Sequence, residues 1–424
     1  MSEATVSPTT PPPLLLQGGA AFFPALIAAI DGAAYWVQLE TYIFDFHRVA
    51  ADVAEALVRA GQRGVTVQVL VDGIGTAPLQ KDWENKLKMA GVHWQVYSPL
   101  TGNWPSLGLV RPDRWRRLHR KLCVVDQQLV FCGGVNVLDD FYDPRHGTLA
   151  APRFDFTVAL HGPVAEAASE AMALLWWRVQ AGYSARRHHL AAAWEAFKAA
   201  GYGGRISAAH LARRRALALS GRPAGARTSK SQPTARAALL VRDNLLNRNI
   251  IERAYRKAIG QAKQDILIAN AYFVPGGRLR RALIKAARRG VKVTLLLQGK
   301  YEYFMQYHAA RPVYGALLDA GVEIHEYEAS FLHAKVAVID GHWATVGSSN
   351  LDPLSLLLAR EANVVLDDRA FAEDLRTQLL AAIAGHGRRV DIAEYNQRPW
   401  RQRVLDLAAY ALMRLALLLA GQRY

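Results

Sequence analysis

Apolar runs alternate with amphipathic segments along the chain, and this alternation occurs twice. In the first half the helix-like LVRAGQRG leads into the apolar run VTVQVLVDG, and a second helical segment ends at AGVHWQVYSP. In the second half LIKAARRG leads into VKVTLLLQG, and a helical stretch ends at AGVEIHEYE. Each half also opens with an apolar strand, near Tyr35 and near Asp265. The pattern predicts parallel strands with crossover helices, hence an α/β sandwich in each half.

A polar motif follows the apolar pattern in each half. It reads LHRKLCVVDQQLVFCGGVN from Leu118 and LHAKVAVIDGHWATVGSSN from Leu332. Five residue types recur at one spacing, namely His119, Lys121, Asp126, Gly133 and Asn136 in the first copy and His333, Lys335, Asp340, Gly347 and Asn350 in the second. A short pattern found once carries a risk of coincidence, but two copies in one chain indicate duplication of a unit.

Two α/β domains packed around one active site are the predicted fold class. The Gly, Pro, Ser and Arg content of GRPAGARTSKSQPTARA marks a flexible connection between them. The predicted segments are a disordered N-terminal tail at 1–19, a first domain at 20–183, a basic helical and flexible linker at 184–236, a second domain at 237–395 and an amphipathic C-terminal helix at 396–424.

Composition agrees with two folded domains and adds a strong positive charge. With 424 residues, 51% of them hydrophobic, the chain is long enough for each domain to bury its own core. The formal net charge of +16 suggests a polyanionic partner, either nucleic acid or an anionic membrane surface. The N-terminal MSEATVSPTTPPP has no basic region followed by an apolar run, so it does not resemble a secretory signal peptide. We therefore predict synthesis in the cytosol.

The chemistry of the motif follows from its spacing. On a strand, His and Lys two residues apart share one face, which places an imidazole beside an ammonium. Gly allows close backbone approach, and Asn adds an amide donor. Two such units facing each other would place two imidazoles, two cations and two amides around one phosphorus atom. These residues include no set that could hold a metal ion, so we predict phosphoryl transfer without a metal or other cofactor. The groups predicted to stabilise charge on the phosphate oxygens are Lys121, Lys335, Asn136 and Asn350.

Two histidines at one phosphorus predict a covalent mechanism. One would attack a phosphodiester and form a phosphohistidine. The other would protonate the departing alcohol and then deprotonate the incoming one. Spacing alone does not decide which of His119 and His333 is the nucleophile.

The duplicated motif resembles that of the phospholipase D superfamily, and the resemblance extends from about residue 20 to residue 380. Bacterial cardiolipin synthases of the phospholipase D type are the most similar branch. Three details favour it: ETYIF at Glu40–Phe44, HRK followed by GGVN in the first copy, and GSSNLDPLSLLLARE in the second. Gly134 stands where many members of the superfamily carry Ser, a departure that cardiolipin synthases often share.

The resemblance also implies roles for individual residues. An acidic residue downstream of each motif orients a catalytic histidine in this superfamily, and Glu361 and Asp155 match those positions. The motif aspartate is usually structural there, so Asp126 and Asp340 enter the candidate catalytic set with a direct role left open. Family precedent favours His119 as nucleophile and His333 as general acid and base.

The implied reaction moves a phosphatidyl group from phosphatidylglycerol to a histidine, releases glycerol, and passes the group to a second phosphatidylglycerol. The implied partners are phosphatidylglycerol and an anionic phospholipid membrane, with no nucleic acid, at the cytoplasmic side of the bacterial inner membrane. The oligomeric state stays open, since two motifs in one chain make a dimer unnecessary for completing a site. Two alternatives keep the same motif: a phospholipase D that hydrolyses phospholipid, and a phosphodiesterase nuclease. A membrane-binding module with a relict site is disfavoured by two intact motifs.

The C-terminal VLDLAAYALMRLALLLAGQRY predicts a helix with a narrow polar stripe. Asp406, Tyr410 and Arg414 follow four-residue spacing and leave a wide apolar face. The segment is short for a membrane crossing, which needs about 20 apolar residues. We therefore predict a helix in the plane of a membrane, with a helix buried against the core or a partner subunit as the alternative. Its flanking cations are Arg401, Arg403 and Arg423.

Overall fold

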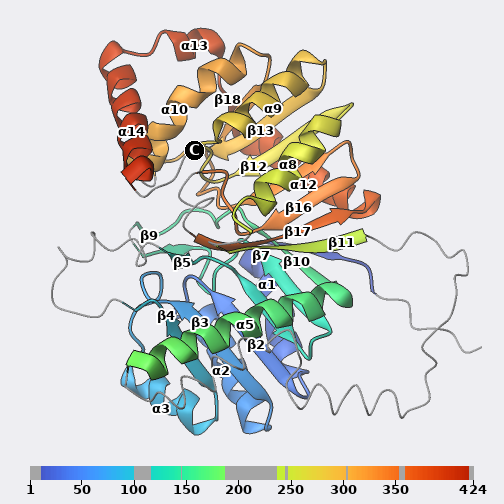
Figure 1. The fold of residues 1–424 in the computed structure, drawn as a ribbon, viewed down its shortest axis with the longest axis vertical. Helices are drawn as coiled ribbons and strands as arrows, with labels where there is room; N and C mark the ends of the chain where they lie inside the picture. The colour runs from blue at the N-terminus through green and yellow to red at the C-terminus, as the bar shows by residue number, and fades with distance from the viewer. Residues whose placement is uncertain are drawn as a thin grey trace, which may run out of the picture.

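The computed structural model describes residues 11–99, 116–144, 146–186, 236–243, 247–301, 304–352 and 359–419. Two sheets form the two halves of the molecule (Figure 1). The first runs in the order β1 (Leu14–Gln17), β10 (Phe156–His161), β7 (Leu129–Gly133), β6 (Leu122–Val125), β2 (Trp36–Thr41), β3 (Thr66–Asp72), β4 (His93–Tyr97). The second runs in the order β11 (Arg236–Arg242), β17 (Ala359–Asp367), β16 (Trp343–Gly347), β15 (Lys335–Ile339), β12 (Asp265–Asn270), β13 (Lys292–Gln298), β14 (Glu323–Tyr327), β18 (Gly387–Arg389).

Strand by strand, the first seven positions of the two sheets correspond, which confirms two duplicated α/β units. The expectation of parallel sheets is wrong in part, because within the two sheet orders above the parallel pairs are those of β2–β3–β4 and β12–β13–β14. The two strands of each motif, β6–β7 and β15–β16, pair antiparallel. The reason is local: a tight turn at residues 126–128 joins β6 to β7, and so short a connection can join only antiparallel neighbours.

The two halves share one hydrophobic core. It contains residues from both sheets, among them Val124, Phe156, Val336 and Val364. Helices α5 (Pro163–Arg186) and α12 (Arg369–His386) contribute to it, and each also touches a strand of the other half. The outer faces are covered by α1 (Gly18–Asp31), α2 (Val49–Gln62) and α3 (Lys81–Met89) on the first sheet, and by α8 (Ile250–Gln261), α9 (Gly277–Arg288) and α10 (Phe304–Leu318) on the second.

The remaining elements lie outside the two sheet orders and their covering helices. Strands β8 (Tyr142–Asp143) and β9 (Gly147–Thr148) pair with each other, and β5 (Arg117–Leu118) pairs with β17. After α12 the chain forms α13 (Ile392–Asn396) and α14 (Trp400–Leu419). Figure 1 shows α14, in red, beside α10 at one end of the second half.

The structure changes one predicted boundary and leaves others open. The predicted tail at 1–19 contains β1 and the start of α1, because the apolar Leu14, Leu15 and Leu16 pair with β10. Residues 1–10 and most of the predicted linker, 187–235, lie outside the described residues, as does the end of the predicted C-terminal helix, 420–424. The division into domains at 20–183 and 237–395 stays a prediction.

Candidate active site

Each motif histidine is held by the backbone of the opposite half. In the first half, β5 runs parallel to β17, and the His119 N–H donates to the Arg360 carbonyl at 3.0 Å. In the second half, a bridge joins Leu332 to Phe154, and the His333 N–H donates to the Phe154 carbonyl at 2.9 Å. These crossed backbone contacts bring the two histidine segments to the boundary between the sheets.

The histidine side chains are crossed in the same way. His119 Nδ1 lies 3.0 Å from Glu361 Oε1, and His333 Nδ1 lies 2.6 Å from Asp155 Oδ2. Both carboxylates are buried, while the imidazoles keep exposed fractions of 17% and 16%. A carboxylate at Nδ1 fixes the orientation of the ring and leaves Nε2 as the nitrogen for chemistry. Each acid predicted downstream of a motif therefore lies against the histidine of the other motif.

Both motif lysines are buried beside these histidines. Lys121 Nζ donates to the carbonyl of His119 at 2.8 Å, and Lys335 Nζ donates to the carbonyl of His333. Burial lowers the pKa of Lys121 to about 7, because an ammonium loses hydration there. Burial also lowers the pKa of His119; Glu361 opposes this shift, and the charges of Lys121 and Lys335 add to it. A lysine from each half thus acts electrostatically on the same imidazole.

The second histidine has the more strongly perturbed environment. Burial holds the pKa of His333 well below its usual value, and Lys335, Lys121 and His119 lower it further. Burial raises the pKa of its partner Asp155 to about 7. Since the two groups are hydrogen-bonded, we treat them as one pair that retains a proton near neutral pH.

The two motif asparagines lie at the same sheet edge as the lysines. The Gly133 N–H donates to the Lys121 carbonyl, so the end of β7 meets the beginning of β6 there. Asn136 follows that strand end, and its Oδ1 accepts the Ile43 N–H at 3.2 Å. Asn350 follows the end of β16 and is buried. Their predicted role as phosphate ligands stays a prediction.

The motif aspartates lie away from this cluster, and their contacts argue for a structural role and against a direct catalytic one. Asp126 accepts the backbone N–H groups of residues 34–36 at 2.8–2.9 Å. Asp340 accepts those of residues 263–265 at 2.8–3.1 Å. Partial burial raises the pKa of Asp340, but these hydrogen bonds lower it overall. Asp126 is five residues beyond Lys121, at the far end of β6 and roughly 17 Å away at strand rise.

Sequence reasoning missed Tyr42 as a site residue. Its ring centroid lies 5.1 Å from that of His119, and Lys121 Nζ lies 5.5 Å from the ring centre. The ETYIF segment carries part of the family resemblance, and its aromatic residue directly after β2 is the signal that could have identified Tyr42. Among the described residues, no group of three His, Cys, Asp or Glu side chains could hold a metal ion.

The two motif copies differ at the residue that contacts the orienting carboxylate, which is Gly134 beside Asp155 and Ser348 beside Glu361. Ser348 Oγ donates to Glu361 Oε2 at 2.5 Å. A Cβ atom at Gly134 would instead overlap both carboxylate oxygens of Asp155. The first half therefore combines the shorter acid with glycine, and the second half combines the longer acid with serine.

Gly134→Ser is expected to lower turnover by at least about a hundredfold, because the new side chain displaces Asp155 from His333. Ser348→Gly is the matched control: it removes one hydrogen bond to a carboxylate without overlap, with an expected loss of about tenfold. Steady-state rates of the two folded variants provide the measurement. A smaller loss in Gly134→Ser than in Ser348→Gly would contradict the steric argument.

The lowered pKa of Lys121 predicts the alkaline limb of the pH profile. An ammonium is charged below its pKa, so kcat/KM should fall as the pH rises through about 7. Lys121→Arg keeps its charge over this range and should flatten the alkaline limb at a lower absolute rate. Rate measurements from pH 6 to about pH 9 test this. Superimposable limbs in the two proteins would rule out Lys121 as the titrating group.

Comparison with known proteins places the chain in a family. The family model described as cardiolipin synthase, PLD-like domain, matches residues 26–143 and 255–382. The chain therefore belongs to the phospholipase D superfamily, within this cardiolipin synthase family, and the predicted resemblance is confirmed. Cardiolipin synthase B of Escherichia coli (strain K12) is 36% identical over 410 residues, which cover 94% of this chain and 86% of the relative.

More distant relatives cover nearly the whole chain. Cardiolipin synthase A of Cronobacter sakazakii is 28% identical, with 91% of this chain and 72% of the relative covered. The crystal structure of phosphatidylserine synthase from Haemophilus influenzae Rd KW20 superposes with a TM-score of 0.63 at 15% identity, over 96% of this chain and 94% of that one. The solved structure supports the fold alone.

Proposed function

We propose that this protein is a cardiolipin synthase that transfers a phosphatidyl group from one phosphatidylglycerol to another and releases glycerol. The observation that carries the proposal is the pair of crossed histidine–carboxylate contacts at one buried, lysine-containing site. The similarity to cardiolipin synthase B over nearly the full chain supports the choice of substrate.

The asymmetry of the two pairs supports a division of roles. His119 is the nucleophile: its Nε2 attacks the phosphorus while the bond to the glycerol oxygen breaks. The Asp155–His333 pair retains a proton near neutral pH, which His333 passes to that oxygen. In the second step His333 takes a proton from the acceptor hydroxyl, whose oxygen attacks the phosphorus as the bond to His119 breaks. Lys121 and Lys335 stabilise charge on the phosphate oxygens in both steps.

Product analysis separates this function from its alternatives. Purified protein incubated with phosphatidylglycerol vesicles should give cardiolipin and glycerol, identified by mass spectrometry, with and without EDTA. Phosphatidic acid as the main product would indicate the hydrolytic phospholipase D instead. Cleavage of DNA without any lipid product would indicate the nuclease, and a strict requirement for added divalent metal would contradict the proposed chemistry.

The C-terminal helix packs against the core through its polar stripe. Asp406 is 1% exposed, lies 2.7 Å from His308 Nδ1 of α10, and pairs with Arg398 at 2.9 Å. The opposite face of α14 is apolar and exposed, so the helix both packs on the protein and offers an apolar surface. The exposed apolar residues are Trp400, Val404, Leu405, Leu407, Leu412 and Leu415.

This apolar face supports peripheral membrane association. None of the described helices has the length and hydropathy that crossing a bilayer requires. We propose that α14 lies in the interface of an anionic membrane with Leu407 and Leu412 inserted, and that Arg401 and Arg403 contact headgroups. The cytoplasmic face of the inner membrane is the proposed location, where phosphatidylglycerol would be both substrate and surface.

Leu407→Glu combined with Leu412→Glu should weaken binding to phosphatidylglycerol vesicles by more than about tenfold, because each buried leucine contributes about 1.5–3 kcal/mol. The matched control is Met89→Glu with Leu380→Glu, which adds the same charge at exposed apolar positions on α3 and α12. Vesicle co-sedimentation measures the change. Equal binding of the two double variants would show that α14 does not dock on the membrane.

A further inference from the structure

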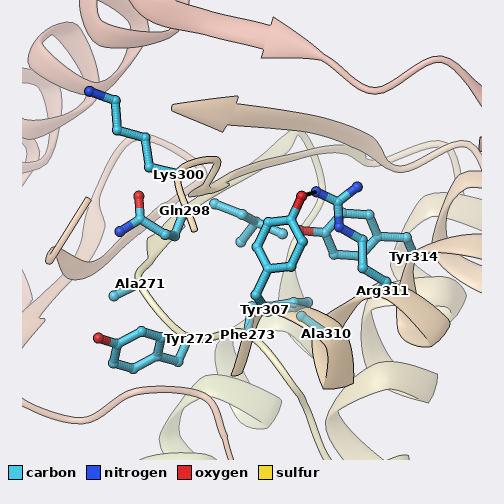
Figure 2. A pocket seen from close by; sticks show the side chains of 10 residues that line it. Ala271, Tyr272, Phe273, Gln298, Lys300, Tyr307, Ala310, Arg311 and Tyr314 are labelled. Carbon is cyan, nitrogen blue, oxygen red and sulfur yellow. Dashed lines mark hydrogen bonds between the residues drawn. The ribbon is translucent and has the colours of Figure 1, made fainter. Parts of the chain in front are cut away.

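A pocket opens at the carboxyl ends of β12 and β13 in the second half. It encloses about 380 Å³ of space, part of it open to solvent. Ala271 directly follows β12, Gln298 ends β13, and Lys300, Tyr307 and Arg311 complete the polar and aromatic lining used below. Figure 2 shows Lys300 and Gln298 on one side and Tyr307 beside Arg311 on the other. Because part of this space is open to solvent, the polar lining is accessible to a headgroup from outside.

Two pocket residues are bonded to the segment that carries His333. Gln298 Oε1 accepts the Leu332 N–H at 3.1 Å. The Ala271 N–H donates to the Ala334 carbonyl at 3.0 Å. The residues on both sides of His333 are therefore fixed by the pocket wall, and the pocket adjoins this half of the active site.

The internal repeat shows why the pocket adjoins only one histidine. The last-but-one residue of β2 is Glu40, which pairs with the residue three positions after His119. The last-but-one residue of β12 is Ala269, which pairs with the residue three positions after His333. Tyr42 and Ala271, which directly follow those strands, are therefore counterparts. Tyr42 covers His119 with its ring, whereas the methyl group of Ala271 leaves the corresponding position to the pocket.

The pocket offers donors to an anion and rings to a polyol. Lys300 is exposed, and its Nζ uses one of three N–H groups to bind the Ala329 carbonyl at 2.9 Å. Arg311 binds the Tyr307 hydroxyl at 2.7 Å and Glu326 at 3.0 Å. These contacts fix Tyr307 and Arg311 in the wall, while Lys300 brings a positive charge to the opening.

We infer that this pocket binds the glycerophosphate headgroup of the acceptor phospholipid, with its phosphodiester at Lys300 and its free hydroxyl directed to His333. The inference rests on the proposed function and deepens it, since it separates an acceptor side at His333 from the donor attached to His119. In the second step, His333 takes the proton of that hydroxyl. The hydroxyl oxygen then bonds to phosphorus, and the electrons of the breaking phosphorus–nitrogen bond return to the His119 ring. A filled pocket favours this alcohol over water.

Ala271→Tyr tests the inference by placing in the second half the ring that the first half already has. With phosphatidylglycerol vesicles, the ratio of cardiolipin to phosphatidic acid should fall at least about tenfold. Glycerol release should fall less than cardiolipin formation, because the departing glycerol reaches His333 but lacks the phosphodiester that we infer to bind Lys300. Ala21→Tyr, at an exposed position on α1, is the matched control for added bulk.

Lys300→Glu provides a second variant at an exposed position, where folding is not at risk. It should raise the phosphatidylglycerol concentration needed for half-maximal cardiolipin formation by at least about tenfold, without a matching change in glycerol release. An unchanged product ratio in Ala271→Tyr, together with an unchanged concentration dependence in Lys300→Glu, would overturn the acceptor pocket. If the unmodified enzyme forms no cardiolipin at all, the proposed function itself fails.

Discussion

His119→Ala should abolish covalent capture of the phosphatidyl group and lower cardiolipin formation by about a millionfold, the loss typical of a missing nucleophile. His333→Ala should lower the rate by about a hundredfold to ten-thousandfold, because it removes only proton transfer. The covalent intermediate should still form slowly in His333→Ala and accumulate, since no base activates the acceptor. Phosphatidylglycerol labelled in its phosphate, followed by denaturation at alkaline pH and detection of labelled protein, separates the two variants.

His93→Ala controls for the loss of an imidazole outside the site, at an exposed position on β4. It should bind label and form cardiolipin at the rate of the unmodified enzyme. Label on His119→Ala but not on His333→Ala would reverse the assignment of the two roles. Retained turnover in both variants would refute the two-histidine mechanism.

Glu361→Gln should reproduce the defect of the His119 variant, and Asp155→Asn that of the His333 variant. The crossed contacts are the reason: each carboxylate holds the Nδ1 proton of the histidine in the other half. Replacing such a carboxylate by an amide favours the wrong tautomer and lowers turnover by up to about ten-thousandfold. Loss of labelling in Glu361→Gln, and persistence of label in Asp155→Asn, would be the distinguishing observations.

Double variants make the crossed pairing quantitative. His119→Ala with Glu361→Gln should be little worse than His119→Ala alone, because the acid acts through that ring. His119→Ala with Asp155→Asn should lose further activity. The opposite order of coupling would mean that each acid serves the histidine of its own half.

Local patterns in the sequence were sufficient to find the duplication and the residues of each motif. Strand alternation placed His and Lys on one face, and both lysines lie with their histidines at one sheet edge. The pairing of acids with histidines could not be predicted, because 242 residues separate His119 from Glu361 and 178 separate Asp155 from His333. Contacts at such separations depend on how the two sheets pack, which no short pattern specifies.

Two other features could not be placed from the sequence for the same kind of reason. A motif aspartate has the same sequence spacing whether it faces a substrate or ties down a turn, and only the length of β6 places Asp126 at the far end. The polar stripe of α14 gave the helix two unlike faces without showing which one meets the core. The buried contact of Asp406 with His308 decides that the apolar face is outward.

The crossed pairs also constrain how this chain can change over generations. A substitution at Asp155 alters a histidine 178 residues later, so selection acts on the two repeats jointly. Either repeat alone would carry an imidazole without its carboxylate, and only association with a second repeat would supply the missing group. The duplicated halves can diverge around their pockets, as Tyr42 and Ala271 have, but they cannot become two independent enzymes.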